Sequence, residues 1–288
     1  MITINNLNSN ESITFDSVGS YILNEEDLGG IAGTHSTSKS LGQHGAHHTG
    51  TVLESRDIPI SGTIIAENEY EMEIKKRDLI ELINPLENLR LIRASYKIEG
   101  RATSTVNFSK NYSENNNYIC KFIFILFCVN PFWSNTQETK TDIALWKGAF
   151  HFPLIIPVKK GVIMGYKDPS LIVNIVNDGN IEVGMVIEFR ARGSISNPSL
   201  FNVNTRKWIK IEKSMVAGEV IKVNTNFGKK RVEQYINGVT SNGFTYLKRG
   251  SEFLQLNKGD NLFRYDADSN LDNLEVAIYY NSNYLGVV

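Results

Sequence analysis

Hydrophobic and polar residues alternate with a period of two through most of the chain, which is the pattern of strands with one buried face. A continuous apolar run, Phe122 to Val129, is instead typical of a central strand that is covered on both faces. The pattern therefore predicts a mostly β protein. The clearest alternating runs are Ile2 and Ile4; Ile58, Ile60 and Ile64, with Gly62 between them; Ile92, Ala94, Tyr96 and Ile98; Met185, Ile187, Phe189 and Ala191; and Leu274, Val276, Ile278 and Tyr280.

One segment has the period of a helix instead. Asn68 suits the N-cap position, and Glu71 three residues later suits a capping box. The dipeptide Asn84-Pro85 ends the segment, because the residue before proline avoids the helical region. The spacing predicts one substantial helix between these signals. Its expected buried stripe consists of Met72, the aliphatic stem of Lys76, Leu79, Ile80 and Ile83.

Three stretches show neither period and are expected to be irregular: 29–50, 110–117 and 134–146. The first holds six glycines and four of the five histidines, so it is expected to be a flexible loop. Between Phe152 and Pro157, prolines bracket a stiff crossing, which we take as a domain boundary. Residues 1–152 then form a first domain, and residues 153–288, with short strands and Gly/Asn turns, form a second that is expected to be a β-sandwich.

Composition narrows the function classes. The 288 residues carry a formal net charge of −1, which removes the bulk attraction that non-specific nucleic-acid or polybasic membrane binding needs. The longest apolar run is less than half of the roughly 20 residues that a membrane-spanning helix requires, and the N-terminus has no signal-peptide pattern. Cys120 and Cys128, about 26 Å apart if they share one strand, are expected to be reduced thiols.

The candidate chemical sites each have a simpler interpretation. His35, His44, His47 and His48 are good ligands for zinc or nickel, but glycines flank them and no carboxylate is near until Glu54. This favours a flexible polar loop whose histidines either make hydrogen bonds or contact another chain. The serine-nucleophile elbow and the phosphate-binding loop are absent. No cofactor is therefore expected.

Acidic and aromatic residues of the second domain leave two alternatives open. Asp266 and Asp268 have the spacing of paired carboxylates for glycoside hydrolysis or calcium binding, although a polar turn explains them more simply. Aromatic side chains can stack on sugars, but they also fill β-sandwich cores. The residues that would test a carbohydrate-binding face are Trp208, Tyr246 and Tyr265.

Several strings, in order along nearly the whole chain, resemble the distal tail (Dit) family of siphophages. The most specific is the apolar strand that runs into an Asn-Pro-Phe-Trp motif, Phe124 to Trp133. The others are Arg56 to Ile64, Lys76 to Pro85, Phe152 to Leu154, Asn177 to Asn180, Ala191 to Gly193 and Ser251 to Asn261. The 29–50 loop is longer and richer in glycine than the family pattern.

The resemblance implies a structural protein of the virion tail tip, assembled in the bacterial cytoplasm, and not an enzyme. It implies a tail-tube-like β-sandwich or barrel with one helix for residues 1–152, which would form a hexameric ring, and a galectin-like β-sandwich for residues 153–288. The implied partners are further copies of the chain, the tail tube protein, the tail-associated hub or lysin protein and receptor-binding proteins. We expect ring or partner contacts at His35, Lys39, His44, His47, His48, Arg56 and Arg77.

Overall fold

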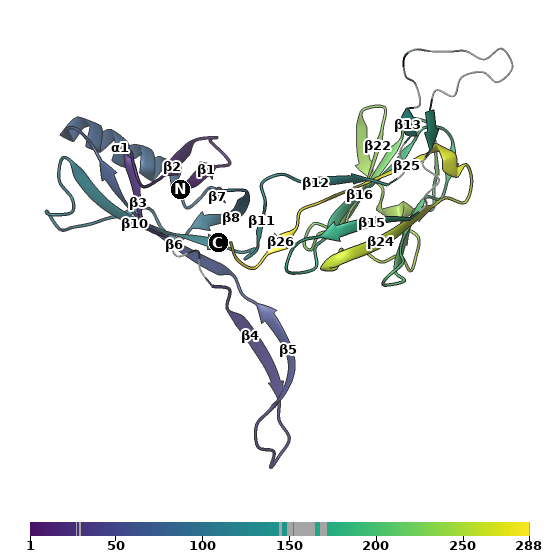
Figure 1. Ribbon diagram of the computed structural model, residues 1–288, viewed down its shortest axis with the longest axis horizontal. Coiled ribbons are helices and arrows are strands. Elements are labelled where there is room, and N and C mark those ends of the chain that lie inside the picture. The colour runs from purple at the N-terminus through teal and green to yellow at the C-terminus, as the bar shows by residue number, and fades with distance from the viewer. Residues whose placement is uncertain are drawn as a thin grey trace. The chain divides into compact units, whose positions relative to one another are not determined.

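The chain folds into two compact units, which the computed structural model describes at residues 1–26, 28, 30–143, 146–148, 152, 165–167 and 172–287. Unit 1 contains Met1–Thr136 and Tyr284–Val288, and unit 2 contains Gln137–Asn283 (Figure 1). The expected fold class, mostly β with one α-helix in the first unit and a β-sandwich in the second, is confirmed for the described residues. Among them, no helix is long and apolar enough to cross a membrane.

Unit 1 is built on a curved antiparallel sheet in the order β2-β1-β7-β8-β10-β6-β3. Backbone hydrogen bonds join Asp16, just after β2, to Tyr21 and Leu23 of β3, so the two ends of the sheet meet and the sheet closes like a barrel. Its strands are β1 (Ile2–Asn6), β2 (Ser12–Phe15), β3 (Tyr21–Glu26), β6 (Arg56–Ile65), β7 (Leu89–Arg93), β8 (Tyr96–Ala102) and β10 (Ile119–Cys128), with short β9 (Asn107–Phe108), β11 (Trp133–Asn135) and β26 (Asn283–Tyr284) beside them.

The alternation of β6 and β10 fills the core of this barrel. Ile58, Ile60 and Ile64 point inward, and Gly62 lies opposite Phe122 across the pair. A Cβ at residue 62 would lie 2.4 Å from the Phe122 ring and 2.6 Å from the Ile22 carbonyl oxygen, so only glycine fits there. The run around Phe122 is central in the sheet as predicted, but it is buried on one face only; the expectation of cover on both faces is wrong for the isolated chain.

The helix α1 (Glu69–Leu82) begins and ends where its sequence signals predict. The Asn68 side chain accepts a hydrogen bond from the Glu71 amide at 2.9 Å, and the Glu71 carboxylate accepts one from the Glu67 amide at 2.7 Å. Met72, Leu79 and Leu82 are buried. Ile80, expected on the buried stripe, is 45% exposed.

Two local predictions in unit 1 need correction. The alternating run from Ile92 to Ile98 is not one strand: β7 and β8 form a hairpin that turns at Ala94 and Ser95, where Ala94 has a left-handed φ of 49°. The 29–50 stretch is not an irregular loop. It contains β4 (Gly33–Ser38) and β5 (His47–Leu53), which pair with each other in a separate antiparallel hairpin.

Unit 2 is a β-sandwich. One sheet has the order β12-β25-β16-β21-β22-β23, the other has the order β15-β24-β18-β19, and one hydrophobic core draws residues from both. The strands are β12 (Thr139–Asp142), β13 (Trp146–Gly148), β14 (Gly165–Lys167), β15 (Ile172–Asn177), β16 (Met185–Ala191), β17 (Ile195–Ser196), β18 (Ser199–Asn202), β19 (Trp208–Lys210), β20 (Ser214–Met215), β21 (Val220–Asn224), β22 (Arg231–Ile236), β23 (Val239–Asn242), β24 (Gly259–Asp266) and β25 (Leu274–Tyr280), with 3-10 turns η1 (Phe244–Tyr246) and η2 (Leu271–Asn273).

The division between the units lies earlier than the predicted boundary after residue 152. The strand β12 already pairs with β25 of the sandwich, Thr139 opposite Tyr280, so the chain has entered unit 2 before the proline-bracketed segment. Residues 153–157 themselves lie outside the described residues. The last residues return to unit 1, where the Tyr284 ring packs edge-on against Tyr96 at 5.1 Å between centroids.

Candidate functional site

The outward face of β10 in unit 1 carries an apolar stripe. Four side chains of this stripe, all on one face of the strand, remain 37–45% exposed: Ile119, Ile123, Ile125 and Phe127. The fifth outward residue, Lys121, is held aside by an ion pair with Glu114 at 2.8 Å, and hydrogen bonds from Lys121 and Ser109 lower the pKa of that carboxyl. Aligned β-branched and aromatic side chains on an exposed sheet face are typical of surfaces that another chain covers.

The strands on either side of this stripe carry both polar and apolar residues. On β6, Asp57 lies opposite Phe127 and Thr63 opposite Lys121, whereas Ile65, 40% exposed, lies opposite Ile119; on β8, Arg101 lies opposite Phe127. The charged residues Asp57 and Arg101 therefore border the Phe127 end of the stripe, and a charged rim beside an apolar centre is common in protein–protein interfaces.

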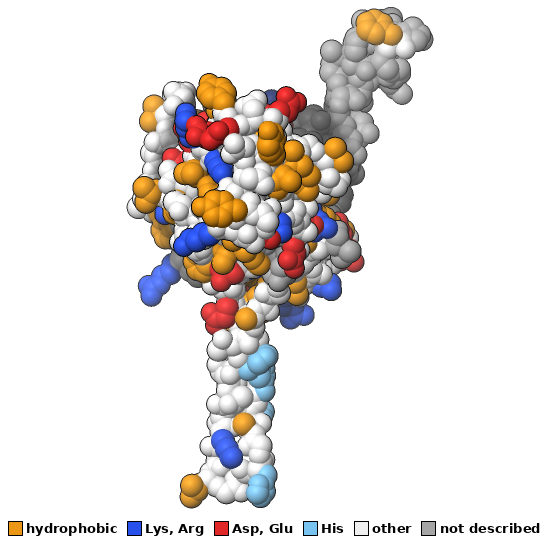
Figure 2. Space-filling view, turned by 90° about the vertical axis from the view of Figure 1, so that its left-hand side faces the viewer, with side chains coloured by type: hydrophobic (Ala, Val, Ile, Leu, Met, Phe, Trp, Pro, Cys, Tyr) orange, Lys and Arg blue, Asp and Glu red, His pale blue; other side chains and the backbone are white. Residues whose placement is uncertain are grey.

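The β4–β5 hairpin is the second exposed feature of unit 1. Within it, only Gly50 is even partly buried, and its strands pair with no other strand of the described chain. Figure 2 shows it as a narrow arm with few charged side chains and with histidines along one edge. The Thr51 hydroxyl lies 2.8 Å from both His35 Nδ1 and His48 Nε2, and the two imidazole rings are 5.6 Å apart.

Most of the residues predicted to contact partners lie on this arm. His35, Lys39, His44, His47 and His48 are all exposed there, and within the described chain no group of histidine, cysteine and acidic residues has the geometry to hold a metal ion. Arg77 is exposed on α1 and is not part of the arm.

Arg56 was predicted to contact a partner, and this expectation is wrong in the isolated chain. Its side chain is 1% exposed, and its guanidinium donates hydrogen bonds to the carbonyls of Leu28, at 3.2 Å, and Leu285. Burial lowers the pKa of Arg56. The residue fastens the returning C-terminal segment to the barrel.

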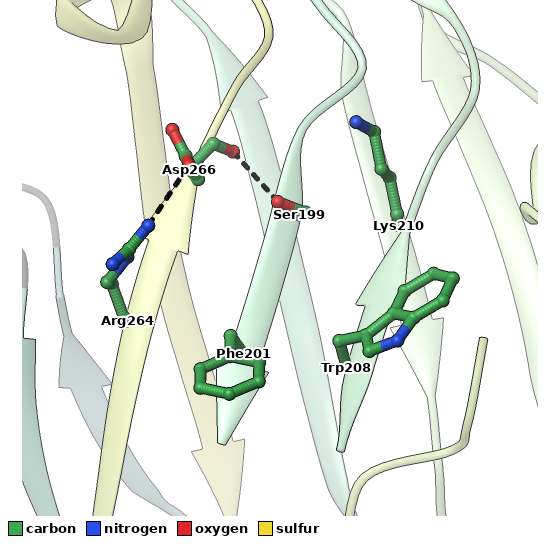
Figure 3. A pocket seen from close by; sticks show the side chains of 6 residues that line it. All are labelled: Ser199, Phe201, Trp208, Lys210, Arg264 and Asp266. Atoms are coloured by element: carbon green, nitrogen blue, oxygen red, sulfur yellow. Dashed lines mark hydrogen bonds and ion pairs between the residues drawn. The ribbon is translucent and has the colours of Figure 1, made fainter. Parts of the chain in front are cut away.

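In unit 2, six side chains line a shallow pocket of about 310 Å³ on the outward face of the β15-β24-β18-β19 sheet (Figure 3). They come from three adjacent strands and are in register with one another: Asp266, Ser199 and Lys210 in one row, and Arg264, Phe201 and Trp208 in the next. Trp208 was predicted from the sequence; Phe201, Ser199, Lys210 and Arg264 were not.

The other two aromatic residues predicted for a glycan face do not join this pocket. Tyr265 is 1% exposed, because it lies between the outward residues Arg264 and Asp266 and therefore faces the core. Tyr246 lies on η1, outside the pocket lining, with the Lys213 ammonium 5.0 Å above its ring.

Asp268 has the wrong electrostatics for a general acid. Asp268 accepts hydrogen bonds from Lys210 Nζ at 2.5 Å and Asn197 Nδ2 at 2.9 Å, and these lower the pKa of its carboxyl. Glycoside hydrolysis needs one carboxyl with a raised pKa. The geometry therefore favours a structural turn over a catalytic pair.

Both cysteines are buried in unit 1, and we expect their thiols to be unreactive in the folded protein. Burial raises the pKa of Cys128 to about 12 and also raises that of Cys120. Since 9.0 is the pKa of an exposed thiol, the thiolate fraction of Cys128 at pH 8 is lowered about a thousandfold. Titration with a thiol reagent should detect almost no reaction before unfolding and two thiols in urea; fast reaction of either in native protein contradicts this.

Models of known protein families match both units of the chain. The model of the phage tail protein RIFT-related domain matches residues 11–128, and the model of the C-terminal domain of siphovirus-type tail components matches residues 178–284. A search of curated proteins finds no sequence match. The matched families are structural tail components, so the prediction that the protein is not an enzyme is confirmed by these matches.

A solved structure shares this fold over nearly the whole chain. The Dit protein (gp 19.1) of phage SPP1, described as a paradigm of the hub adsorption apparatus in phages that infect Gram-positive bacteria, aligns with a TM-score of 0.68 and 12% identity over 98% of this chain and 99% of that one. Chains of the phage P2 baseplate in its activated conformation, with Ca or with Sr, align with 12% identity over 97% of each chain and a TM-score of 0.48. With both units matched in their order along the chain, the protein belongs to the distal tail (Dit) family of siphovirus-type tail components and is a structural part of the virion tail tip.

Proposed function

We propose that copies of this chain close into a hexameric ring that joins the tail tube to the hub protein below it. The observation that carries the proposal is the apolar stripe on β10, which a single chain leaves exposed. Closed rings need heterologous contacts, in which one surface of each copy meets a different surface of the next. The stripe and the β4–β5 arm provide two such surfaces on unit 1.

The stripe supplies the apolar part of that contact. Burial of apolar surface stabilises association by roughly 25 cal/mol per Å² before the entropic costs of binding are subtracted. The border of Asp57 and Arg101 then fixes the position of the neighbouring copy, since charges at the edge of an interface set its register more than its strength.

The arm supplies a second contact, in which it grips the neighbouring copy as a belt. Within the part of the chain that the structure describes, its strands pair only with each other, and an isolated two-stranded hairpin is marginally stable in water. Contact with another subunit would satisfy its outer edges by strand pairing. The exposed histidines and Lys39 would lie in that contact.

The remaining partners follow from the family. The SPP1 relative is named for a hub adsorption apparatus, and for this chain we propose the tail tube protein and the tail-associated hub or lysin protein as the partners of the ring. Unit 1 then forms the ring, while unit 2, as an outward galectin-like sandwich, is the part that receptor-binding proteins would contact. The near-zero net charge suits a scaffold whose partners are proteins.

Negative-stain electron microscopy and mass photometry of the purified protein test the ring, and a matched pair of variants tests its interface. Ile123 and Ile80 are both 45% exposed, the first on the stripe and the second on α1. We expect hexameric rings from the wild type, an at least tenfold higher concentration for half-assembly of Ile123→Glu, and unchanged assembly of Ile80→Glu. Monodisperse single chains of well-folded wild type at high concentration, or equal assembly of both variants, would contradict the proposal.

A further inference from the structure

We propose that the pocket on the outward face of the β15-β24-β18-β19 sheet binds a neutral saccharide, with a sugar ring stacked on Trp208. This inference concerns unit 2 alone and does not depend on the ring. It assigns the domain a ligand of its own, in addition to any protein that it contacts.

The register of the three strands creates the site. On β24, β18 and β19, the residues that line the pocket alternate with residues that are buried in the sandwich core. The buried residues are Phe263, Tyr265, Leu200 and Ile209. The lining residues therefore all face outward. The side chains shown together in Figure 3 therefore occupy fixed positions on a rigid sheet and not on a loop. Binding sites on strands hold their geometry better than sites on loops.

The aromatic row provides the stacking surface. Phe201 lies directly opposite Trp208 across the β18–β19 pair, and both rings are partly exposed. No described residue accepts a hydrogen bond from the Trp208 indole N–H, which leaves that donor free for a ligand. Gly250 lies beside the indole, since a Cβ at residue 250 would be in van der Waals contact with the Trp208 ring, at 3.7 Å. Because glycine has no side chain, this edge of the ring stays open.

The charged groups of the pocket are already paired, which selects a neutral ligand. Lys210 Nζ lies 2.5 Å from an Asp268 oxygen, and Arg264 lies 3.5 Å from an Asp266 oxygen. A phosphate or sulfate would have to displace these carboxylates. A sugar hydroxyl both donates and accepts, so it can bind a carboxylate oxygen and the neighbouring cation without separating the pair.

The size of the pocket limits the ligand to a short saccharide unit. Its volume of about 310 Å³ is at the lower end of the range for small-ligand sites. Since the pocket is shallow and open to solvent, the affinity for a single unit is expected to be weak, with a Kd on the order of 1 mM. Repetition of such a site in an assembled tail tip would raise the avidity for a cell-wall polysaccharide.

The test uses the full-length protein and a panel of soluble probes: lactose, maltose, cellobiose and N-acetylglucosamine oligomers. Isothermal titration calorimetry measures saturable binding of each probe to wild type, Trp208→Ala and Phe227→Ala. The control Phe227 is an aromatic residue of unit 2 that is 68% exposed and lies outside the pocket. We expect at least one probe to bind the wild type and the control equally and to bind Trp208→Ala at least tenfold more weakly.

A second variant separates hydroxyl recognition from stacking. Arg264→Gln keeps a donor but breaks the pair with Asp266, and we expect a roughly threefold to tenfold loss of affinity for the same probe with an unchanged melting temperature, since Arg264 is exposed. The proposal is overturned if no member of the panel binds at concentrations about ten times the expected millimolar Kd. It is also overturned if Trp208→Ala binds like the wild type, or if Trp208→Ala prevents attachment of another tail protein while no probe binds.

Discussion

Removal of the β4–β5 arm is expected to abolish the proposed ring while both units of each chain keep their folded stability. The backbone makes this deletion possible, because the Glu54 amide donates to the Ala32 carbonyl at 2.9 Å and so holds the two ends of the arm together. Joining Ala32 to Glu54 through a two-residue Asn-Gly turn removes residues 33–53 and leaves β3 and β6 paired as before.

The expected selectivity follows from where the arm makes its contacts. It contributes no residue to the core of unit 1, so its loss costs the folded chain little. In an assembly, a gripping arm would instead bury both of its faces and its unpaired edges against a neighbour. Its removal should therefore raise the dissociation constant far more than the single substitution Ile123→Glu does.

Size-exclusion chromatography with light scattering measures the outcome. A variant that lacks only residues 40–43 at the tip is the matched control: β4 and β5 remain paired, and Lys39 and the four histidines of the arm are kept, so rings should persist. Differential scanning calorimetry checks that both variants are folded. Rings of wild-type size and stability from the full deletion would show that the arm has no part in closure.

The helix and the main strands could be predicted because their signals are local or periodic. Asn68 and Pro85 bracket α1 by capping and steric effects that act within a few residues. In β6 and β16, apolar residues recur at every second position because one side of each strand faces a hydrophobic core. The fold class of both units followed from these patterns.

The arm could not be predicted because neither of its faces is buried in the chain itself. Residues 33–38 are Gly, Thr, His, Ser, Thr and Ser, and without a core to face, no apolar alternation marks them as a strand. The turn at Ala94 could not be predicted either, because the apolar residues before and after it continue the same period of two. The sequence placed the boundary too late because β12, Thr139–Asp142, carries no apolar residue that would assign it to the sandwich.

Part of the candidate site could be predicted from the alternation of inward and outward residues along each strand. Arg56 has the same parity as Ile58 and Ile60, so its burial follows if β6 is extended to its first residue. Tyr265 has the opposite parity to Asp266, so the two cannot both face solvent on one strand. The alternation along single strands could not predict that β18, β19 and β24 are neighbours in the sheet. This pairing places Phe201 and Arg264 beside Trp208.

Trp133→Ala is expected to destabilise unit 1 by about 3–5 kcal/mol, as is usual when a large aromatic side chain is removed from a core. Trp133 ends the Asn-Pro-Phe-Trp motif on which the family resemblance rests, and its side chain is fully buried in the core of unit 1. It lies at the start of β11, which pairs with β8 and with the returning β26, so the cavity would loosen the contact among three segments. The motif is then a packing element of the barrel and not a binding site.

Trp133→Phe is the matched control for this substitution. Among the described residues none accepts a hydrogen bond from the Trp133 indole N–H, so phenylalanine loses no bond and keeps much of the volume, and we expect a cost below about 1.5 kcal/mol. Urea unfolding followed by circular dichroism gives both values, and calorimetry should assign the loss to the transition of unit 1 alone. A cost under about 1 kcal/mol for Trp133→Ala, or equal costs for the two variants, would mean that the motif stabilises the assembled tail tip and not the barrel.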